Sequence, residues 1–418
     1  MTAAWSSDQP NIVLIMADDM GYECVRANGG ETYHTPHLDQ LAATGVRFEH
    51  CYSQPICTPS RVQLMTGHYN HRNYVKFGVL DPDQTTFAHL LKDAGYATCV
   101  AGKWQLDGGF NAPQHFGFDE YCLWQLTIRK SRYPNPTIEQ NGRVLPVVEG
   151  SYGPDIVTDF LLDFIDRHQN SPFLAYYPMI LPHWPFEPTP DSADWDPQAE
   201  GVLKGVGQKK YFPDMVTYTD KMVGKLVAKL NQLGLRENTL ILFTGDNGTY
   251  NKVESNLNGQ AYMGGKGTML DNGTHVPMIA NWTGHLPEGR VTSKLVDFSD
   301  VLPTLVDVAG DKLPLDHPWD GQSLLPEMMN QAQPERPWVY CWYTRNAKAN
   351  ELQVAVRDQE CKLYQDGRFY NVKKDPWEKT PVTKHDTASA NARAAFQKVI
   401  EEKRLQWAFR NWGDAGGR

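Results

Sequence analysis

The sequence has no apolar run that approaches the ~20 residues a membrane-spanning helix needs, which excludes such a helix. It also has no excess of basic residues, because the formal net charge is −9 and the charges lie in many short groups. A nucleic-acid-binding protein usually gathers Lys and Arg on one surface. We therefore expect neither a nucleic-acid partner nor a membrane span.

Cysteine is scarce and scattered. The chain has 7 cysteines in 418 residues, and none forms a Cys-x-x-Cys pair. This spacing excludes a disulfide framework, and we expect all but one of the cysteines to be small core residues. The first ten residues also lack the basic and then apolar pattern of a signal peptide. We expect no signal peptide in the chain as given.

Between residues 10 and 310, short apolar runs rich in β-branched residues alternate with longer amphipathic ones. This alternation is typical of α/β proteins. We expect a large mixed, mostly parallel sheet sandwiched by helices. The predicted strands are 11–17, 96–101, 173–180, 239–244 and 276–281, and the predicted helices include 86–94, 156–168, 215–233 and 298–309.

The pattern changes after Pro334. Short alternating strands are predicted at 338–343, 353–357 and 361–364, followed by a helix at 388–408. We expect a smaller C-terminal antiparallel sheet plus helix, and hence a catalytic α/β domain over 1–334 and an α+β subdomain over 335–418. The proline-rich segment 181–197 has no regular pattern and is predicted to be a surface loop.

Two polar pairs follow predicted strands. Asp18-Asp19 comes directly after strand 11–17, and Asp246-Asn247 follows strand 239–244. Alone, either pair would as readily cap a turn. Ligands of open α/β sheets bind beyond the carboxyl ends of the strands, so the two pairs are candidates for one site. Oxygen-only side chains favour Ca²⁺, with Mg²⁺ as the alternative, over Zn²⁺.

Cys57 opens the stretch Cys57-Thr58-Pro59-Ser60-Arg61. A lone cysteine is usually an inert core residue. Here Pro59 suits the first position of a helix that continues to a stop at Gly67, which places residue 57 at a helix N-terminus. The partial positive charge there favours an anionic nucleophile or substrate.

Three basic side chains also follow or adjoin predicted strands. Lys103 and His183 are expected just past strands 96–101 and 173–180, and Lys266 lies in the loop Gly264-Gly265-Lys266-Gly267. Each alone reads as a solvated loop residue. Together with Arg61, they would form the cationic pocket that an acidic chain needs to hold a sulfuryl or phosphoryl group.

These motifs resemble those of the type I sulfatases of the alkaline phosphatase superfamily. The most specific is Cys-x-Pro-Ser-Arg at Cys57; the opening NIVLIMADDMG, the GDNG at residues 245–248, and GYAT followed by Gly102-Lys103 support it. The resemblance runs from Asn11 to about Pro376. It implies a sulfuric ester hydrolase whose cysteine is converted to formylglycine by a maturation enzyme, and whose formylglycine hydrate attacks sulfur.

The resemblance also implies roles for single residues. Asp18, Asp19, Asp246 and Asn247, with residue 57, would be the metal ligands. Arg61 and Lys103 would hold the formylglycine hydrate, and His183 and Lys266 would contact the sulfate and the leaving oxygen. The family usually has histidine two residues beyond the lysine, whereas this chain has Gln105. Glutamine can orient the hydrate but cannot act as a base.

Three functions stay open on the sequence: a sulfatase, a phosphodiester or phosphonate monoester hydrolase of the same superfamily, and a non-catalytic binding homologue. Aromatic residues able to stack on sugars favour a sulfated carbohydrate substrate, a small molecule or an oligosaccharide; they include Trp104, Trp124, Trp184, Tyr250 and Trp342. Because sulfated glycans lie mostly outside cells, we expect a periplasmic or secreted protein.

Overall fold

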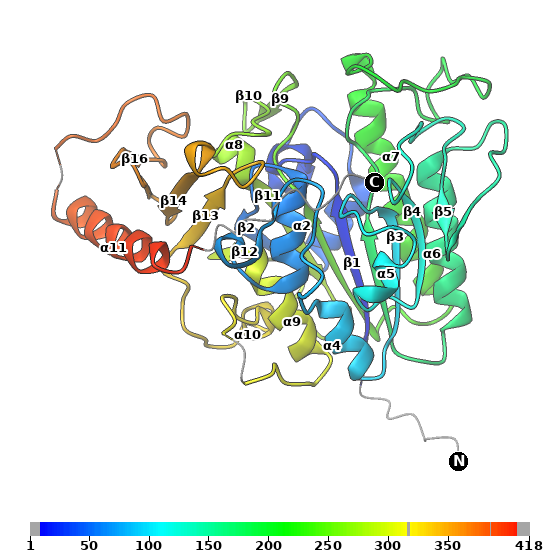
Figure 1. The fold of residues 1–418 in the computed structure, drawn as a ribbon, viewed down its shortest axis with the longest axis horizontal. Helices are drawn as coiled ribbons and strands as arrows, with labels where there is room; N and C mark the ends of the chain where they lie inside the picture. The colour runs from blue at the N-terminus through cyan, green and yellow to red at the C-terminus, as the bar shows by residue number, and fades with distance from the viewer. Residues whose placement is uncertain (1–8, 316–317, 385, 408–418) are drawn as a thin grey trace.

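The computed structural model describes residues 9–315, 318–384 and 386–407. Within these residues the main element is a ten-stranded mixed sheet with β1 in its interior (Figure 1). Strand β11 is antiparallel to both of its neighbours, as are the pairs β4–β5 and β5–β6, and all other neighbours are parallel. In spatial order the strands are β12 (Arg290–Asp297), β2 (Val46–Tyr52), β11 (His275–Asn281), β8 (Thr239–Gly245), β1 (Asn11–Ala17), β7 (Phe173–Pro178), β3 (Ala97–Lys103), β4 (Glu120–Trp124), β5 (Glu139–Gln140) and β6 (Arg143–Val144).

Helices cover both faces of this sheet. The helices of the chain are α1 (Pro36–Ala43), α2 (Cys57–Thr66), α3 (Asn70–Asn73), α4 (Phe87–Asp93), α5 (Ala112–His115), α6 (Gly153–Arg167), α7 (Phe212–Gln232), α8 (Asp271–Thr274), α9 (Val301–Val308), α10 (Leu325–Met328) and α11 (Thr387–Arg404). The even-numbered residues of β1 pack in one core with α2, α4 and α9, and its odd-numbered residues from Val13 pack in another with α1, α6 and α7. Alternate side chains of a strand point to opposite faces, so the apolar run of β1 is buried on both.

A four-stranded antiparallel sheet follows, ordered β13 (Val339–Tyr343), β14 (Gln353–Arg357), β15 (Cys361–Tyr364) and β16 (Phe369–Asn371). Helix α11 packs on β14 and β15, at the far left of Figure 1. A two-stranded ribbon, β9 (Glu254–Leu257) and β10 (Gln260–Met263), lies at the top of the view in Figure 1. The predicted fold class is confirmed, and the domain boundary at residue 334 stays a prediction.

The structure corrects several predicted elements. Strand β3 extends to Lys103, so this lysine ends the strand instead of following it. The predicted helix 298–309 is a 3₁₀ turn, Phe298–Asp300, followed by α9. The predicted C-terminal helix ends at Arg404, and residue 408 lies outside the described residues. Segment 181–197 has no helix or strand, as predicted, but its first half is largely buried, so it is not simply a surface loop.

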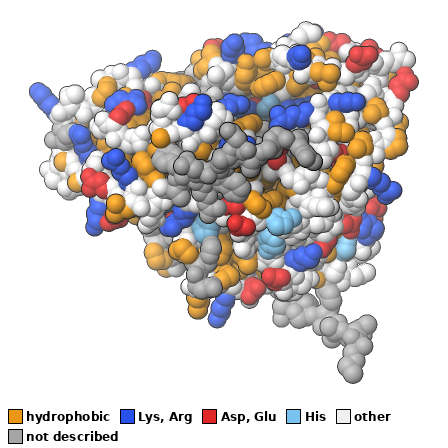
Figure 2. Space-filling view, viewed as in Figure 1, with side chains coloured by type: hydrophobic (Ala, Val, Ile, Leu, Met, Phe, Trp, Pro, Cys, Tyr) orange, Lys and Arg blue, Asp and Glu red, His pale blue; other side chains and the backbone are white. Residues whose placement is uncertain are grey.

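The outer surface carries both signs of charge. Lys and Arg side chains alternate with Asp and Glu side chains over the face seen in Figure 2. Among the described residues, no helix is both long enough and apolar enough to span a bilayer. The dispersed charge predicted from the sequence is therefore present on this face.

Candidate active site

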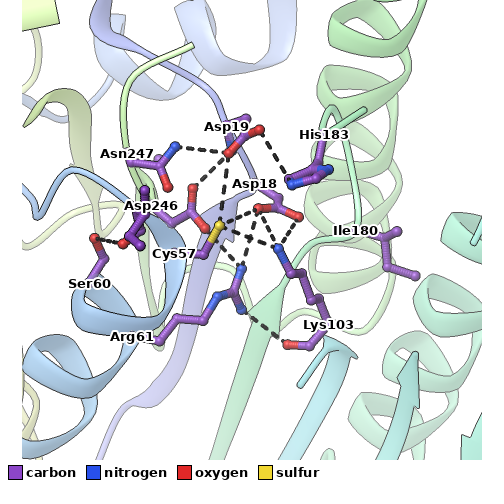
Figure 3. Close-up of polar contacts among 12 residues, drawn as sticks. Asp18, Asp19, Cys57, Ser60, Arg61, Lys103, Ile180, His183, Asp246 and Asn247 are labelled. Atoms are coloured by element: carbon purple, nitrogen blue, oxygen red, sulfur yellow. Dashed lines mark hydrogen bonds and ion pairs between the residues drawn. The ribbon is translucent and has the colours of Figure 1, made fainter. Parts of the chain in front are cut away.

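The two polar pairs converge at neighbouring strand ends (Figure 3). Strands β1 and β8 are parallel, and Ala17 lies opposite Gly245, so the residues that follow leave the sheet side by side. The backbone N–H of Asp19 donates to Oδ1 of Asp246 at 2.9 Å, and Nδ2 of Asn247 donates to Oδ1 of Asp19 at 2.9 Å. The predicted convergence of the two pairs is therefore observed.

Residue 57 lies over this cluster. Its Sγ is 3.6 Å from Oδ1 of Asp18 and 3.5 Å from Nζ of Lys103, and the residue is buried. Burial, together with the charge of Asp246, raises the pKa of the Cys57 thiol to about 12. A buried thiol of this kind is protonated at neutral pH and is a poor nucleophile.

Helix α2 begins at Cys57, two residues earlier than predicted, so Pro59 is its third residue and not its first. The Ser60 hydroxyl explains the early start, because it donates to the carbonyl oxygen of Ile56 at 3.0 Å and accepts the N–H of Gln54 at 3.1 Å. The predicted stop at Gly67 is confirmed, with φ of 68° in the left-handed region. Residue 57 thus lies in the first turn, where helix N–H groups are free.

Arg61 and Lys103 bind the carboxylates from below. Nη2 of Arg61 is 3.1 Å from Oδ2 of Asp246, and its Nη1 donates to the carbonyl oxygen of Lys103 at 3.1 Å. Nζ of Lys103 is 2.9 and 2.7 Å from the two oxygens of Asp18. Burial opposes the charge of Arg61, but Asp246 and Asp18 raise its pKa. Both cations are therefore held beside residue 57.

Lys266 and His183 bind the opposite carboxylate. Nζ of Lys266 is 2.6 Å from Asp19, and its backbone N–H donates to the carbonyl oxygen of Thr249 at 3.0 Å. Nε2 of His183 is 3.5 Å from Oδ2 of Asp19. Burial lowers the pKa of His183 well below its usual value, against the charge of Asp18. The four residues predicted for the cationic pocket thus surround one cluster, although burial favours the neutral form of His183.

Gln105 faces the same cavity but makes no hydrogen bond to residue 57 among the described residues. Its Oε1 is buried and has no hydrogen-bond partner among the described residues, and its backbone is left-handed with φ of 57°. No hydrogen bond joins Gln105 to Cys57 in the described part of the chain. The structure therefore leaves the amide oxygen free to bind a ligand.

Arg132 is a site residue that sequence reasoning missed. Its Nη1 lies 3.7 Å from Oδ2 of Asp18 and has no hydrogen-bond partner among the described residues. Its guanidinium stacks on the ring of Trp124, 4.0 Å from the centroid, and the residue is 8% exposed. The only signal in the sequence is the basic run Arg129-Lys130-Ser131-Arg132, which by itself reads as a solvated loop.

The cluster has the donor set for a hard cation. One ligand atom each from Asp18, Asp19, Cys57 and His183 can be chosen so that all lie within 4.8 Å of one another. Oδ1 of Asn247 is buried without a hydrogen-bond partner. Burial and the charge of Asp18 raise the pKa of Asp246 to about 7. A divalent cation would bind the unpartnered oxygen of Asn247 and neutralise the charge of Asp246, since carboxylate and amide oxygens are its preferred ligands.

A cavity of about 470 Å³ opens above this cluster. Cys57, Gln105, Arg132, His183 and Lys266 line it, so the reactive groups face one space. Of the aromatic candidates, Trp124, Trp184 and Tyr250 line the cavity, whereas Trp104 and Trp342 are buried in the core. The cavity therefore combines cations with flat apolar surfaces.

Comparison with known proteins agrees with this arrangement. The Sulfatase family model matches residues 10–311, and the model for the C-terminal region of N-sulphoglucosamine sulphohydrolase matches residues 261–406. The chain is 32% identical to N-acetylgalactosamine-6-sulfatase of Mus musculus over 377 residues, covering 81% of this chain and 70% of that protein. It is 33% identical to human arylsulfatase A over 372 residues, covering 79% and 70%.

A solved structure has the same fold over nearly the whole chain. The crystal structure of Ps i-CgsB in complex with k-i-k-neocarrahexaose superposes with a TM-score of 0.78. The two sequences are 26% identical, and the match covers 97% of this chain and 94% of that one.

Proposed function

The chain belongs to the sulfatase family, and from this premise we propose that it hydrolyses the sulfate ester of a carbohydrate in the cavity above residue 57. The observation that carries the proposal is the set of cations around a buried acidic cluster: Arg61, Lys103, Lys266 and Arg132. A relative named for N-acetylgalactosamine 6-sulfate and a neighbour that binds a carrahexaose support a sugar substrate. Trp124, Trp184 and Tyr250 in the cavity support it independently, because aromatic rings stack on sugar faces.

Sulfatases generally use a formylglycine and a divalent cation. We assign the formylglycine to position 57, made from the cysteine by a maturation enzyme, and the cation to Asp18, Asp19, Asp246 and Asn247 with residue 57. The oxygen-rich set favours Ca²⁺, with Mg²⁺ as the alternative. When bound, the cation neutralises the carboxylates and stabilises charge that develops on the sulfuryl oxygens.

The side chains have separable tasks. We assign Arg61 and Lys103 to orienting the oxygens of the modified residue 57. The assignment is supported by Nζ of Lys103, which lies 3.5 Å from Sγ of Cys57, and by Nη1 of Arg61, which donates to the carbonyl oxygen of Lys103. Lys266 and Arg132 bind sulfuryl oxygens from the cavity side. His183 and Lys266 contact the leaving sugar oxygen, and Lys266, whose charged form the neighbouring Asp19 favours, donates a proton to it while the bond between sulfur and that oxygen breaks.

Release of sulfate then requires removal of a proton from the oxygen that stays on residue 57. Gln105 faces the cavity with its amide oxygen free, and it can accept a hydrogen bond but not a proton. We therefore assign Gln105 to orientation only. His183 or Asp19 would act as the base, since both lie beside residue 57.

The decisive experiment has two readouts. A mass spectrum of the peptide with residue 57 should show loss of the thiol and gain of an aldehyde when the chain is made in a host that performs this oxidation. The same protein should release sulfate from at least one member of a panel of sulfated mono- and oligosaccharides. A modified residue 57 with faster turnover of phosphate diesters than of every sulfate ester would favour the phosphodiesterase alternative, and no turnover of either would favour a binding protein.

We also propose a periplasmic or secreted location, since sulfated glycans lie mostly outside cells. Fractionation of the native host tests this, and recovery of the protein only with cytoplasmic markers would contradict it.

A further inference from the structure

The active-site cavity is lined by basic residues without acidic ones. Its lining includes Arg129, Lys130, Arg132, Lys266 and Arg345, and no Asp or Glu of the described residues is part of it. This contrasts with the chain as a whole, whose formal net charge is −9. A cavity of one sign concentrates ligands of the other sign. This lining suits an anionic ligand.

These cations fall into two groups. Lys266 and Arg132 lie beside Asp19 and Asp18, at 2.6 and 3.7 Å, and belong to the sulfate site. Arg129, Lys130 and Arg345 make no ion pair with any carboxylate among residues 9–315, 318–384 and 386–407, although they line the same cavity. Three cations are thus left over after the scissile sulfate is bound.

The loop that carries Arg129 and Lys130 is held in place from below. The buried carboxylate of Glu139 accepts the N–H groups of Leu126 and Thr127 at 3.1 and 2.8 Å, and also the Thr127 hydroxyl. Loops held in this way lose little entropy when they bind a ligand.

The ends of the same loop are fixed as well. Nε1 of Trp124 donates to the carbonyl oxygen of Lys130 at 3.1 Å. When the side-chain amide of Gln125 is oriented with its oxygen toward Arg129, this oxygen accepts hydrogen bonds from Nε and Nη2 of Arg129, each at 3.1 Å. The guanidinium of Arg129 is therefore oriented before any substrate binds.

Arg345 reaches the cavity from the other sheet, just past the end of β13. Its carbonyl oxygen accepts the Tyr74 hydroxyl at 2.8 Å and the N–H of Phe77 at 3.0 Å. Its guanidinium lies 4.5 Å from the centroid of the Phe77 ring. A stacked guanidinium keeps its hydrogen-bonding edge free, which suits recognition of planar or branched anions.

We infer that Arg129, Lys130 and Arg345 form a second anion subsite, which binds a further sulfate or carboxylate group of the same substrate. The inference rests on the proposed function, and it narrows the substrate to carbohydrates with at least two anionic groups. Sulfate and carboxylate share the chemistry that these cations recognise, so the two are separated by experiment.

Binding is measured with the full chain carrying Cys57→Ala, so that no turnover is needed. Calorimetry compares N-acetylgalactosamine 6-sulfate with the 4,6-disulfate and with a monosulfated disaccharide that contains a hexuronate. We expect the preferred dianionic sugar to bind about tenfold more tightly than the monosulfate, because a charge-assisted contact is worth this much. The preference should shrink as salt is added.

The double substitution R129Q/R345Q should abolish this preference and leave binding of the monosulfate unchanged. Arg143→Gln is the matched control, because Arg143 is an exposed arginine of the same region that does not line the cavity. A preference for the disulfate alone identifies sulfate as the second group, and one for the hexuronate identifies carboxylate. Equal affinities in the parent chain, no binding of either dianionic sugar, or an equal loss for all sugars in the double variant overturns the inference.

Turnover separates this inference from the proposed function. Dianionic preference without sulfate release by the Cys57 chain would contradict the proposed hydrolysis and leave the subsite standing. Sulfate release without any preference for a second anion would support the proposed hydrolysis and overturn the second subsite.

Discussion

The carboxylates of Asp246 and Asp320 are both shielded from solvent, but they differ in how their charge is compensated. Asp320 accepts Nε and Nη2 of Arg72 at 2.7 and 3.1 Å and the N–H of Tyr69 at 3.0 Å, and Lys403 lies 3.5 Å away. Burial raises its pKa, but hydrogen bonds from His68 and Arg72 outweigh burial and lower it. The charge of Asp320 is therefore well paired.

Asp246 has one direct cationic partner, Arg61, and two neighbouring carboxylates. Burial and the charge of Asp18 outweigh that partner and raise its pKa to about 7. A buried carboxylate with incomplete compensation costs stability, so it is retained for a task. The cluster of Asp320 joins α3 to α11 and stabilises the fold, whereas the cluster of Asp246 opens toward a cavity and is suited to binding.

The strongest test of the functional cluster is Cys57→Ala. Because this change removes the group that becomes the nucleophile, we expect sulfate release to fall by about 10⁴-fold or more. The assay is initial rate of sulfate release on the best substrate of the panel. Cys51→Ala is the matched control, since Cys51 is a buried core cysteine of β2 outside the site, and it should keep its rate. Equal losses in both variants would show that the cysteine acts only through packing.

Exchanging each aspartate for asparagine tests the comparison directly. Asp246→Asn should lower the rate about 10²–10³-fold, because it weakens cation binding and charge stabilisation, and should change the free energy of unfolding by less than about 1 kcal/mol. Asp320→Asn should leave the rate per folded molecule unchanged and lower the free energy of unfolding by about 2 kcal/mol, because it removes charge-assisted hydrogen bonds from Arg72. Urea unfolding with excess chelator and the rate assay measure both quantities.

The pH dependence of Asp320→Asn provides a further control. The pKa of Asp320 is lower in the folded state than in the unfolded state. Its contribution to the free energy of unfolding is therefore full at pH values above the unfolded pKa of about 4, and it is lost as the pH falls through the folded pKa. The stability difference between the parent and the variant should therefore be full at pH 7 and shrink in acid. A difference that stays constant down to pH 2 would assign the loss to packing instead of charge.

Calcium should stabilise the parent through the Asp246 cluster. At a concentration about 100 times the dissociation constant, a bound cation adds about 2.7 kcal/mol. Differential scanning fluorimetry with and without Ca²⁺ should show a higher Tm in the parent and in Asp320→Asn, but a smaller shift in Asp246→Asn. The same shift in all three chains would place the cation elsewhere, and a larger shift with Mg²⁺ would replace calcium in the assignment.

The arrangement of the acidic cluster followed from the sequence because its physical basis is local. Asp18-Asp19 and Asp246-Asn247 each follow a strong apolar strand, and adjacent parallel strands bring their ends together. The same local logic located β1, β8 and α6 within a few residues. Structure that depends on residues close together in the sequence can therefore be predicted from sequence patterns.

The features that the sequence did not predict depend on contacts between residues far apart in the chain. Arg132 lies beside Asp18 at the end of a loop that contacts the buried Glu139 and the Trp124 ring, and no spacing in the sequence encodes that path. The start of α2 was misplaced for a related reason. Pro59 favours the first helical position, but the Ser60 hydroxyl bonds to Ile56 and Gln54 and extends the first turn to Cys57.

The smallest effect is expected at Gln105, which lines the cavity with a side chain that cannot act as a base. Histidine at this position would face the cavity and accept a proton, so Gln105→His should raise the rate of sulfate release about tenfold if release is limited by the missing base. The left-handed backbone of residue 105 suits this change, since histidine is among the residues enriched there.

Gln105→Asn is the control for losing the glutamine side chain without gaining a base, because it keeps the amide and shortens the side chain. It should not raise the rate, and only the histidine variant should gain a pH inflection near about 6.5. If both variants lose activity to the same degree, Gln105 acts by orienting residue 57, and the base lies among His183 and Asp19. The Asp246 cluster would then carry both the cation and the proton transfer, which would widen its contrast with the purely structural pairing of Asp320.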